Sequence, residues 1–178
     1  MIETQVILVN SNDEPIGTME KMAAHEAAHL HRAFSVFLFN AEGHMLLQKR
    51  ASTKYHSGGL WTNTCCSHPF PGEDTEQAAQ RRLAEEMGIT NATIHKAFHF
   101  TYTASFSNGL VECEFDHVFC GQYNGPIVPN PDEVEAYRYT PLPQLLAQVH
   151  QKPQYFTAWF LLALPKLQAH YPQWAWGG

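Results

Sequence analysis

Two glutamates in the segment VECEF stand at a spacing that suits proton transfer or metal binding. Glu112 and Glu114 are separated by one residue, and residues i and i+2 of a strand point to the same face. Carboxylates that lie so close repel each other unless a cation or a raised pKa relieves them. The apolar neighbours Leu110, Val111 and Phe115 favour a buried site that holds a metal over a solvated strand face.

Histidine is abundant, with 11 in 178 residues, and His25 and His29 fit the pattern H-E-x-x-H. On a helix this pattern sets two imidazoles one turn apart, where they can bind zinc with Glu26 as a base. Only three letters are fixed, in a chain where histidine is common, so chance matches are expected. We therefore disfavour a zinc protease, and a solvated helix face is the alternative for at least one of these histidines.

A third group of reactive side chains lies in TNTCCSHP, where Ser67 and His68 follow Cys66. A thiol beside a hydroxyl and an imidazole, in a segment that follows a Gly-Gly break, suits a reactive site. The alternative is a buried structural cysteine beside a surface histidine. For the neighbouring Cys65 we adopt that alternative.

The fourth pattern, EDTEQAAQRRLAEEMGI at residues 73–89, aligns with the Nudix box G-x5-E-x7-R-E-U-x-E-E-x-G-U, where U is a bulky apolar residue. Seven positions match in register: Glu73, Arg81, Leu83, Glu85, Glu86, Gly88 and Ile89. Ser67 replaces the first glycine of the pattern, and Arg82 replaces the second glutamate. On a helix Glu85 or Glu86 lies one turn from Arg82, which suits a magnesium–diphosphate unit. A charged amphipathic helix is the alternative.

Together these segments resemble the type I isopentenyl-diphosphate isomerases, a branch of the Nudix superfamily. The resemblance rests on LHRAFSVFLFN, QKRAS, WTNTCCSHP, the modified Nudix helix and VECEFDHVF, in the family's order, and on Trp159. It implies interconversion of isopentenyl and dimethylallyl diphosphate, by protonation and deprotonation through a tertiary carbocation, in the synthesis of isoprenoid precursors. The alternative is a Nudix hydrolase of a nucleotide or isoprenoid diphosphate, which Arg82 disfavours.

The resemblance also implies the roles of individual residues. Cys66 and Glu114 would flank the C5 unit as proton donor and acceptor, with Tyr102 supporting the glutamate. One divalent metal (Mn2+, Zn2+ or Mg2+) would be bound by His25, His31, His68, Glu112 and Glu114.

Further residues would hold the rest of the substrate. Glu86 would help to hold Mg2+ on the diphosphate, and Trp159 would face the carbocation. The phosphates would be gripped by Lys21, Arg50, Lys54, Ser67 and Arg82.

The choice of the second histidine ligand depends on context. Helix spacing favours His25 with His29, whereas the LHRAF segment favours His31, and we follow the segment. This choice requires the chain to leave the helix after His25, so that His31 arrives from the start of a strand.

The elements that must position these residues are strands on both sides of a central helix. Apolar and β-branched runs predict strands at residues 5–9, 33–40, 45–49, 98–104, 110–120 and 136–139, with a hairpin after residue 40 and another after residue 104. Helices are predicted at residues 20–28, 75–87, 142–149 and 155–167, the second capped by Thr75 and ended by Gly88. We expect an α/β (α+β) fold: one compact Nudix-like domain over residues 1–178, with a mixed β-sheet and helices on its faces.

Composition excludes several classes of protein. The 178 residues suffice for one full core, and 44% hydrophobic with 16% charged residues exclude a disordered chain. A net charge of −6 argues against nucleic acid as a partner, and no apolar run reaches the length that spans a membrane. Without an export signal, the four cysteines are expected to be free thiols in a reducing cytoplasm. We expect a monomer that acts on a small molecule.

Overall fold

Strand β3 (His31–Phe39) is the central element of the structure, a computed structural model that describes residues 5–170. Its side chains alternate between two faces, and both faces are buried. Phe34, Val36 and Leu38 belong to one apolar cluster, whereas Phe37 and Phe39 belong to another. The near-continuous apolar run of this segment is therefore explained by a strand that is covered on both sides.

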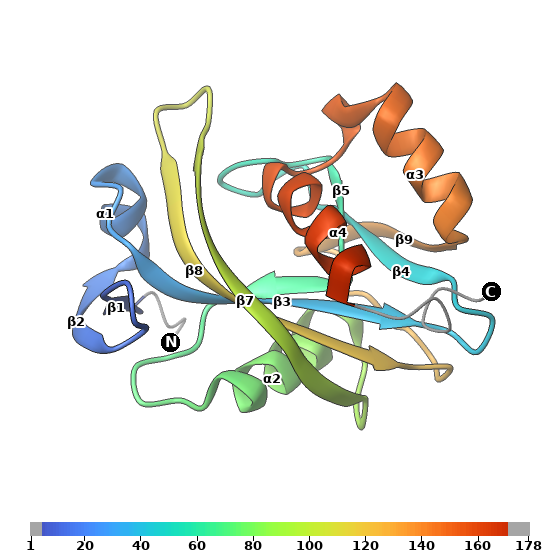
Figure 1. The fold of residues 1–178 in the computed structure, drawn as a ribbon, viewed down its shortest axis with the longest axis horizontal. Coiled ribbons are helices and arrows are strands. Elements are labelled where there is room, and N and C mark those ends of the chain that lie inside the picture. Colours follow the sequence, from blue (N-terminus) through green and yellow to red (C-terminus); the bar gives the residue numbers. More distant parts are fainter. Residues whose placement is uncertain (1–4, 171–178) are drawn as a thin grey trace.

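Nine strands of the described residues form one sheet, and β3 organises it (Figure 1). Along one edge, β3 pairs in parallel with β8 (Val111–Gln122), which pairs antiparallel with β7 (Thr93–Ser105). The other edge of β3 is shared by three strands in turn, which are β1 (Gln5–Val9), β6 (Cys65–Ser67) and β4 (Met45–Arg50). The sheet is completed by β2 (Pro15–Glu20) on β1, and by β5 (Trp61–Thr62) and β9 (Val134–Thr140) on β4.

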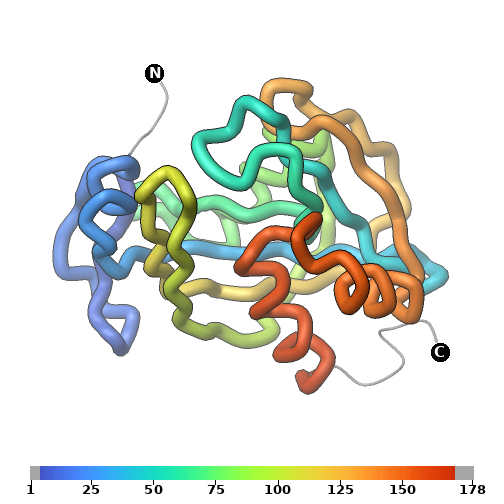
Figure 2. Tube along the Cα trace, turned by 90° about the horizontal axis from the view of Figure 1, so that it is seen from above, coloured from blue at the N-terminus to red at the C-terminus, as the bar shows by residue number. Residues whose placement is uncertain are grey.

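Helices cover both faces of the sheet, as expected (Figure 1). Helix α2 (Thr75–Met87) packs on the face of Phe34, and the opposite face carries α3 (Leu142–Gln151), the 3-10 turn η1 (Pro153–Tyr155) and α4 (Ala158–His170). The short helix α1 (Lys21–Glu26) lies beside strand β8 of the β7–β8 hairpin (Figure 2). No helix within residues 5–170 is long and apolar enough to cross a membrane.

The mixed α+β class is confirmed, and the differences from the predicted elements have local causes. The hairpin predicted after residue 40 is limited to one pair, Phe39 with Met45, because β6 occupies the edge of β3 that β4 would need. Strand β2 was not predicted, because its exposed residues show no apolar alternation. That residues 1–178 form one domain stays a prediction, since the structure describes 5–170.

The ends of α2 follow from its flanking residues. The N-cap is Asp74 rather than Thr75, because the Asp74 carboxylate accepts a hydrogen bond from the backbone N–H of Gln77. Gly88 ends the helix with φ +64°, and a Cβ atom there would lie 2.5 Å from the carbonyl oxygen of Val128. Only glycine fits this left-handed position against a packed backbone.

An ion pair joins the loop before α2 to the helix itself. Arg81 donates from Nε and Nη2 to the two carboxylate oxygens of Glu73, at 2.8 and 2.9 Å, and its guanidinium lies over the ring of Phe70. The hydrogen bonds from Arg81 hold the pKa of Glu73 below its usual value of 4.5.

We predict that Glu73→Gln lowers the free energy of unfolding by about 1 kcal/mol at pH 7, the size of one partly exposed charge-assisted contact. The pKa of Glu73 is depressed by folding, so this stabilisation is present above the ordinary pKa of 4.5 and is lost as the pH falls through the folded value. Urea unfolding at pH 7 and at pH 3 measures the change, with Glu76→Gln in the first helical turn as control. Equal losses at both pH values would contradict an ionic origin.

Candidate active site

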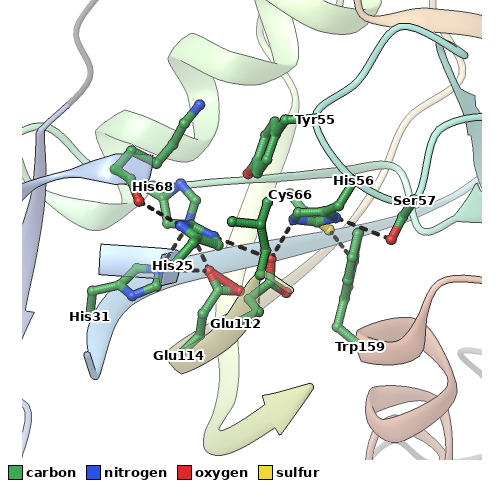
Figure 3. A network of polar contacts seen from close by, with 12 residues as sticks. His25, His31, Tyr55, His56, Ser57, Cys66, His68, Glu112, Glu114 and Trp159 are labelled. Atoms are coloured by element: carbon green, nitrogen blue, oxygen red, sulfur yellow. Dashed lines mark hydrogen bonds and ion pairs between the residues drawn. The ribbon is translucent and has the colours of Figure 1, made fainter. Parts of the chain in front are cut away.

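Three histidines and one glutamate come together at the start of β3 (Figure 3). The parallel register of β3 and β8 sets His31 opposite Glu114, with Nε2 and Oε2 3.2 Å apart. His68, which follows β6, places its Nε2 2.6 Å from the same oxygen. His25 comes from α1, and the four ligand atoms all lie within 4.8 Å of one another. The structure thus gathers four of the five residues that were expected to hold a divalent metal.

Backbone carbonyl groups fix two of the histidine rings. Nδ1 of His25 lies 2.7 Å from the carbonyl oxygen of Lys21, and Nδ1 of His31 lies 2.9 Å from that of His29. A carbonyl oxygen only accepts, so each Nδ1 carries the hydrogen and each Nε2 offers a lone pair. The Nε2 atom of His25 is buried without a hydrogen-bond partner among the described residues. Converging imidazole lone pairs and a carboxylate fit a divalent metal ion.

His29, the alternative to His31, is exposed to solvent. Helix α1 ends at Glu26, Ala28 adopts a left-handed φ of +56°, and the chain then enters β3 at His31. His29 therefore does not share a helix with His25. This removes the geometric basis of a zinc-protease site.

Glu112 and Glu114 meet at one tyrosine. The hydroxyl of Tyr102, which is paired with Glu114 across β7 and β8, contacts Oε1 of both glutamates. A hydroxyl has one hydrogen to donate, so Tyr102 donates to one of the two carboxylates at a time. Burial and the two carboxylates raise the pKa of Tyr102 well above its usual value, which keeps it a donor. Tyr102 can therefore orient both carboxylates toward one point.

His56 belongs to this cluster and was not predicted. Its Nε2 lies 2.9 Å from Oε2 of Glu112, while Nε2 of His25 lies 3.7 Å from the same oxygen. The ring of His56 stacks on Phe106, with centroids 4.2 Å apart, and its Nδ1 lies 3.1 Å from Oγ of Ser57. Glu112 thus faces His25 and His56 in a second group of ligand atoms. The sequence offered no signal for it beyond one histidine among eleven.

The buried contact between His68 and Glu114 shifts the pKa of both groups. Burial lowers the pKa of His68 to about 4, against the opposing charge of Glu114. Burial alone would raise the pKa of Glu114, but the contacts with His68 and His31 hold it well below its usual range. A carboxylate and neutral imidazoles are the forms that bind a metal ion.

Cys66 lines a small cavity of about 30 Å³ that Glu114 and Tyr102 also line. Its thiol donates to Oδ1 of Asn63 at 2.9 Å and accepts from Nε1 of Trp159 at 3.0 Å (Figure 3). Burial raises the pKa of Cys66, so the group is a thiol. The Cys66 thiol and the Tyr102 hydroxyl thus belong to residues that line one space.

The orientation of Asn63 fixes the direction of that thiol. Both amide hydrogens of Asn63 are donated to backbone carbonyls, those of Val36 at 2.9 Å and of Cys65 at 3.0 Å. Its Oδ1 must therefore face Cys66, and it also accepts from the hydroxyl of Thr62. Asn63 is fully buried, and nothing in the sequence analysis had marked it.

A larger cavity of about 450 Å³ adjoins the small one and is lined by charged groups. All five residues that were expected to grip phosphate line it: Lys21, Arg50, Lys54, Ser67 and Arg82. Burial and the charges of Lys54 and Arg82 lower the pKa of Lys21. Cations held this close to one another favour a bound polyanion.

Glutamates balance these cations on the α2 side of the cavity. Arg82 reaches Glu85 at 2.6 Å, Glu86 at 2.9 Å and Glu133 at 3.4 Å. Glu133 also pairs with Lys54 at 2.5 Å. Glu133, which begins no recognised pattern in the sequence, was not predicted. It supplies a negative charge that a bound diphosphate can replace.

Trp159 closes the small cavity from α4. The indole is buried, and the guanidinium of Arg50 lies 5.1 Å from the centre of its ring. Trp159 lines this cavity together with Cys66, Tyr102 and Glu114. The large and small cavities share Arg50, Tyr55, Cys66, Ser67 and His68. The two spaces therefore adjoin each other.

Solved structures share this architecture. A protein of Deinococcus radiodurans superposes with a TM-score of 0.74 and 20% identity, covering 94% of this chain and 99% of that one. The MutT protein of Methanosarcina mazei gives a TM-score of 0.64 at 18% identity, covering 79% of this chain and 94% of that one. At these identities the likeness shows the fold alone.

Sequence relatives are much closer. The chain is 47% identical to isopentenyl-diphosphate Delta-isomerase 2 of Aromatoleum aromaticum, over 93% of this chain and 87% of that protein. It is 49% identical to the isopentenyl-diphosphate Delta-isomerase of Pectobacterium atrosepticum, over 92% and 91%. Residues 29–160 match the NUDIX domain. The chain therefore belongs to the Nudix family, in the branch of the isopentenyl-diphosphate Delta-isomerases.

Proposed function

We propose that this chain interconverts isopentenyl diphosphate and dimethylallyl diphosphate, with Cys66 and Glu114 as the acid–base pair. The observation that carries the assignment of these residues is one small cavity that Cys66, Glu114 and Tyr102 all line. Cys66 and Glu114 reach it from strands on the two opposite edges of β3. The cation-lined cavity beside it supplies the place for the diphosphate. The small cavity thus suits the hydrocarbon end of such a substrate, and the cation-lined cavity suits its diphosphate end.

The diphosphate end is held by charge. Arg50 and Arg82 offer planar forks of N–H donors, whereas Lys21 and Lys54 act as point charges, and Ser67 adds a hydroxyl donor. Binding of the anion would replace the contacts that Glu133 now makes with Lys54 and Arg82. This exchange keeps the site balanced in charge before and after binding.

We further propose that two kinds of divalent ion are used. One ion (Mn2+, Zn2+ or Mg2+) would be held by His25, His31, His68, Glu112 and Glu114, and it would supply positive charge that keeps the glutamates ionised and oriented. Mg2+ would be held with the diphosphate, with Glu86 as the protein ligand. The buried Nε2 of His25 and the carbonyl-anchored rings support the first site.

The proton steps belong to the chain's own groups. One of Cys66 and Glu114 adds a proton to the terminal alkene carbon, which leaves a tertiary cation, and the other removes a proton from the carbon next to the CH2–O group. Reversal of the reaction exchanges their roles. Tyr102 carries a hydrogen bond to the glutamate throughout. The indole face of Trp159 stabilises the cation, by about 2 kcal/mol in a dry site.

A Nudix hydrolase remains the runner-up function, and Arg82 opposes it. In such hydrolases the glutamates of the Nudix box gather metal ions that activate water. Here Arg82 occupies that helix face and pairs with Glu85 and Glu86. A guanidinium at this place holds the diphosphate, and it stands where the Nudix box has a further glutamate that would bind metal.

The proposal also covers the oligomeric state of the enzyme, its compartment and its partners. We propose that it works as a monomer in the cytoplasm and does not bind nucleic acid. The net charge of −6 supports the last point, because a nucleic-acid groove needs the opposite sign.

Incubation of the purified protein with isopentenyl diphosphate and Mg2+ tests the function. We predict that dimethylallyl diphosphate forms without release of phosphate, and that in D2O the new methyl group carries deuterium, because the added proton exchanges with solvent. NMR follows both products. Release of inorganic phosphate or of a monophosphate, without double-bond migration, would support the hydrolase.

Removal of the proposed acid–base thiol should stop turnover without loss of bound substrate or metal. We predict that Cys66→Ala lowers kcat by ~10²–10⁴-fold, the usual effect of removing a positioned acid or base. Substrate binding and the metal content should be unchanged. Cys120→Ala, which removes a buried thiol elsewhere on the same side of the sheet, should keep nearly full activity. Full turnover by Cys66→Ala would overturn the assignment.

Two lysines offer a matched test of the diphosphate site. Lys54 pairs with Glu133 and lines the large cavity, whereas Lys49 pairs with Glu135 on the surface of β4. We predict that Lys54→Met lowers kcat/KM by ~10–100-fold, mainly through KM, because a charge-assisted phosphate contact is lost. Lys49→Met should leave both constants within about twofold of their normal values, well below the size of one such contact. Steady-state kinetics measure both constants. Equal effects of Lys54→Met and Lys49→Met on kcat/KM would contradict a contact between Lys54 and the diphosphate.

A further inference from the structure

The adjacent cysteines of β6 point to opposite faces of the sheet, as neighbours in a strand must. Cys66 faces α4, where its sulfur meets Trp159. Cys65 faces α2 and is fully buried in the apolar cluster on that side. Its surroundings there are not wholly apolar, because its thiol donates a hydrogen bond of 2.9 Å to Oε2 of Glu86. Burial agrees with a structural cysteine, but this contact gives it a further role.

Glu86 is a buried carboxylate with three hydrogen-bond donors around it. Nη2 of Arg82 donates to Oε1 at 2.9 Å. Oε2 accepts from the thiol of Cys65 and from Nε2 of Gln48 at 3.3 Å. Each carboxylate oxygen has two lone pairs, so the two neutral donors fill Oε2, whereas Oε1 keeps one lone pair beside Arg82. The two oxygens of Glu86 therefore differ, because only Oε1 has a lone pair left for a further partner.

This inequality matters because Glu86 also lines the 450 Å³ cavity, together with the cations proposed to bind diphosphate. A carboxylate that binds a metal ion is itself usually fixed by hydrogen bonds from behind. Cys65 and Gln48, both less than 5% exposed, supply such bonds from the protein interior. Without them, the Glu86 side chain is free to turn Oε1 away or to pair with Arg82 through both oxygens.

We propose that Cys65 is a positioning residue, which with Gln48 holds Glu86 so that one carboxylate oxygen is available to a divalent cation bound with diphosphate. The inference rests on the proposed function, since it requires that the cavity takes a metal–diphosphate unit. It assigns the two cysteines to the two ends of the substrate. Cys66 serves the hydrocarbon end, and Cys65 serves the diphosphate end through Glu86.

Three substitutions separate a hydrogen-bonding role of Cys65 from space filling. Cys65→Ser keeps a donor at nearly the same place, Cys65→Ala removes it and leaves space, and Cys65→Val removes it while filling the space. The His/Glu cluster is first loaded with Zn2+. Mn2+ is then titrated in the presence of inorganic diphosphate, and free Mn2+ is measured by its EPR signal. Thermal unfolding verifies that each variant is folded, and Cys65→Val stands in if Cys65→Ala is not.

We expect Cys65→Ala and Cys65→Val to weaken diphosphate-dependent Mn2+ binding by ~3–10-fold, the effect of one lost hydrogen bond, and Cys65→Ser to stay within about twofold. Cys120→Ala, which removes a buried thiol in the cluster of the opposite face, should bind Mn2+ normally. Normal binding by the alanine and valine variants, or equal weakening in the serine or the Cys120 variant, would overturn the proposal.

The same proteins, assayed with isopentenyl diphosphate, separate this inference from the function. Turnover by the unaltered chain, with normal Mn2+ binding in Cys65→Ala and Cys65→Val, would leave the isomerase function standing and refute the role of Cys65. Absence of turnover, with the expected Mn2+ pattern, would refute the isomerase function and support the role of Cys65. Absence of diphosphate-dependent Mn2+ binding in the unaltered chain would also overturn the role of Cys65.

Discussion

The parallel pairing of β3 with β8 is the constraint on which the rest of the site depends. It places His31 beside Glu114 and so puts an ionised carboxylate at the base of a buried cavity. An isolated buried charge is costly, so the surrounding chain must supply partners. His68 arrives from β6 and Tyr102 from β7 because both strands are tied into the same part of the sheet. The cluster is therefore a consequence of strand order, and a shift of one residue between β3 and β8 would turn Glu114 to the other face.

Strand β6 divides the two halves of the chemistry. Its three residues direct one cysteine to the α2 side and one to the α4 side, and Ser67 then lines the large cavity. In the proposed reaction, the hydrocarbon end of the substrate needs a dry space beside the indole of Trp159, because water would trap a carbocation. The charged half needs cations with balancing carboxylates. Because neighbouring residues of β6 point to opposite faces of the sheet, this one short strand contributes to both the hydrocarbon side and the charged side of the site.

Local signals in the sequence predicted much of the fold and part of the site. The rest depends on contacts between residues that lie far apart in the chain. The α2 helix, its end at Gly88 and the β7–β8 hairpin could be predicted, because their periodicity and turn residues lie within one short segment. The contact of His56 with Glu112 joins residues far apart in the chain, so no spacing announces it. In the sequence Asn63 is one more polar residue of a short loop. Its role in orienting the Cys66 thiol becomes visible only through the two carbonyl groups that fix its amide. The resemblance, rather than periodicity, selected His31 over His29.

Arg82 shows how one side chain can redirect a fold that serves other reactions. Its guanidinium stands among Glu85, Glu86 and Glu133, where three carboxylates would otherwise repel one another or collect metal ions. These contacts, chiefly the charge of Glu86, outweigh the cost of burial and raise the pKa of Arg82, so it is a permanent cation. A fixed cation differs from a metal ion in one decisive respect, since it has no open coordination position at which water can be activated. The same charge can therefore hold a diphosphate without preparing its hydrolysis. The proposed acid–base groups, Cys66 and Glu114, lie outside this helix, on β6 and β8. In this proposal the bond that changes is in the hydrocarbon, and the diphosphate serves only for binding.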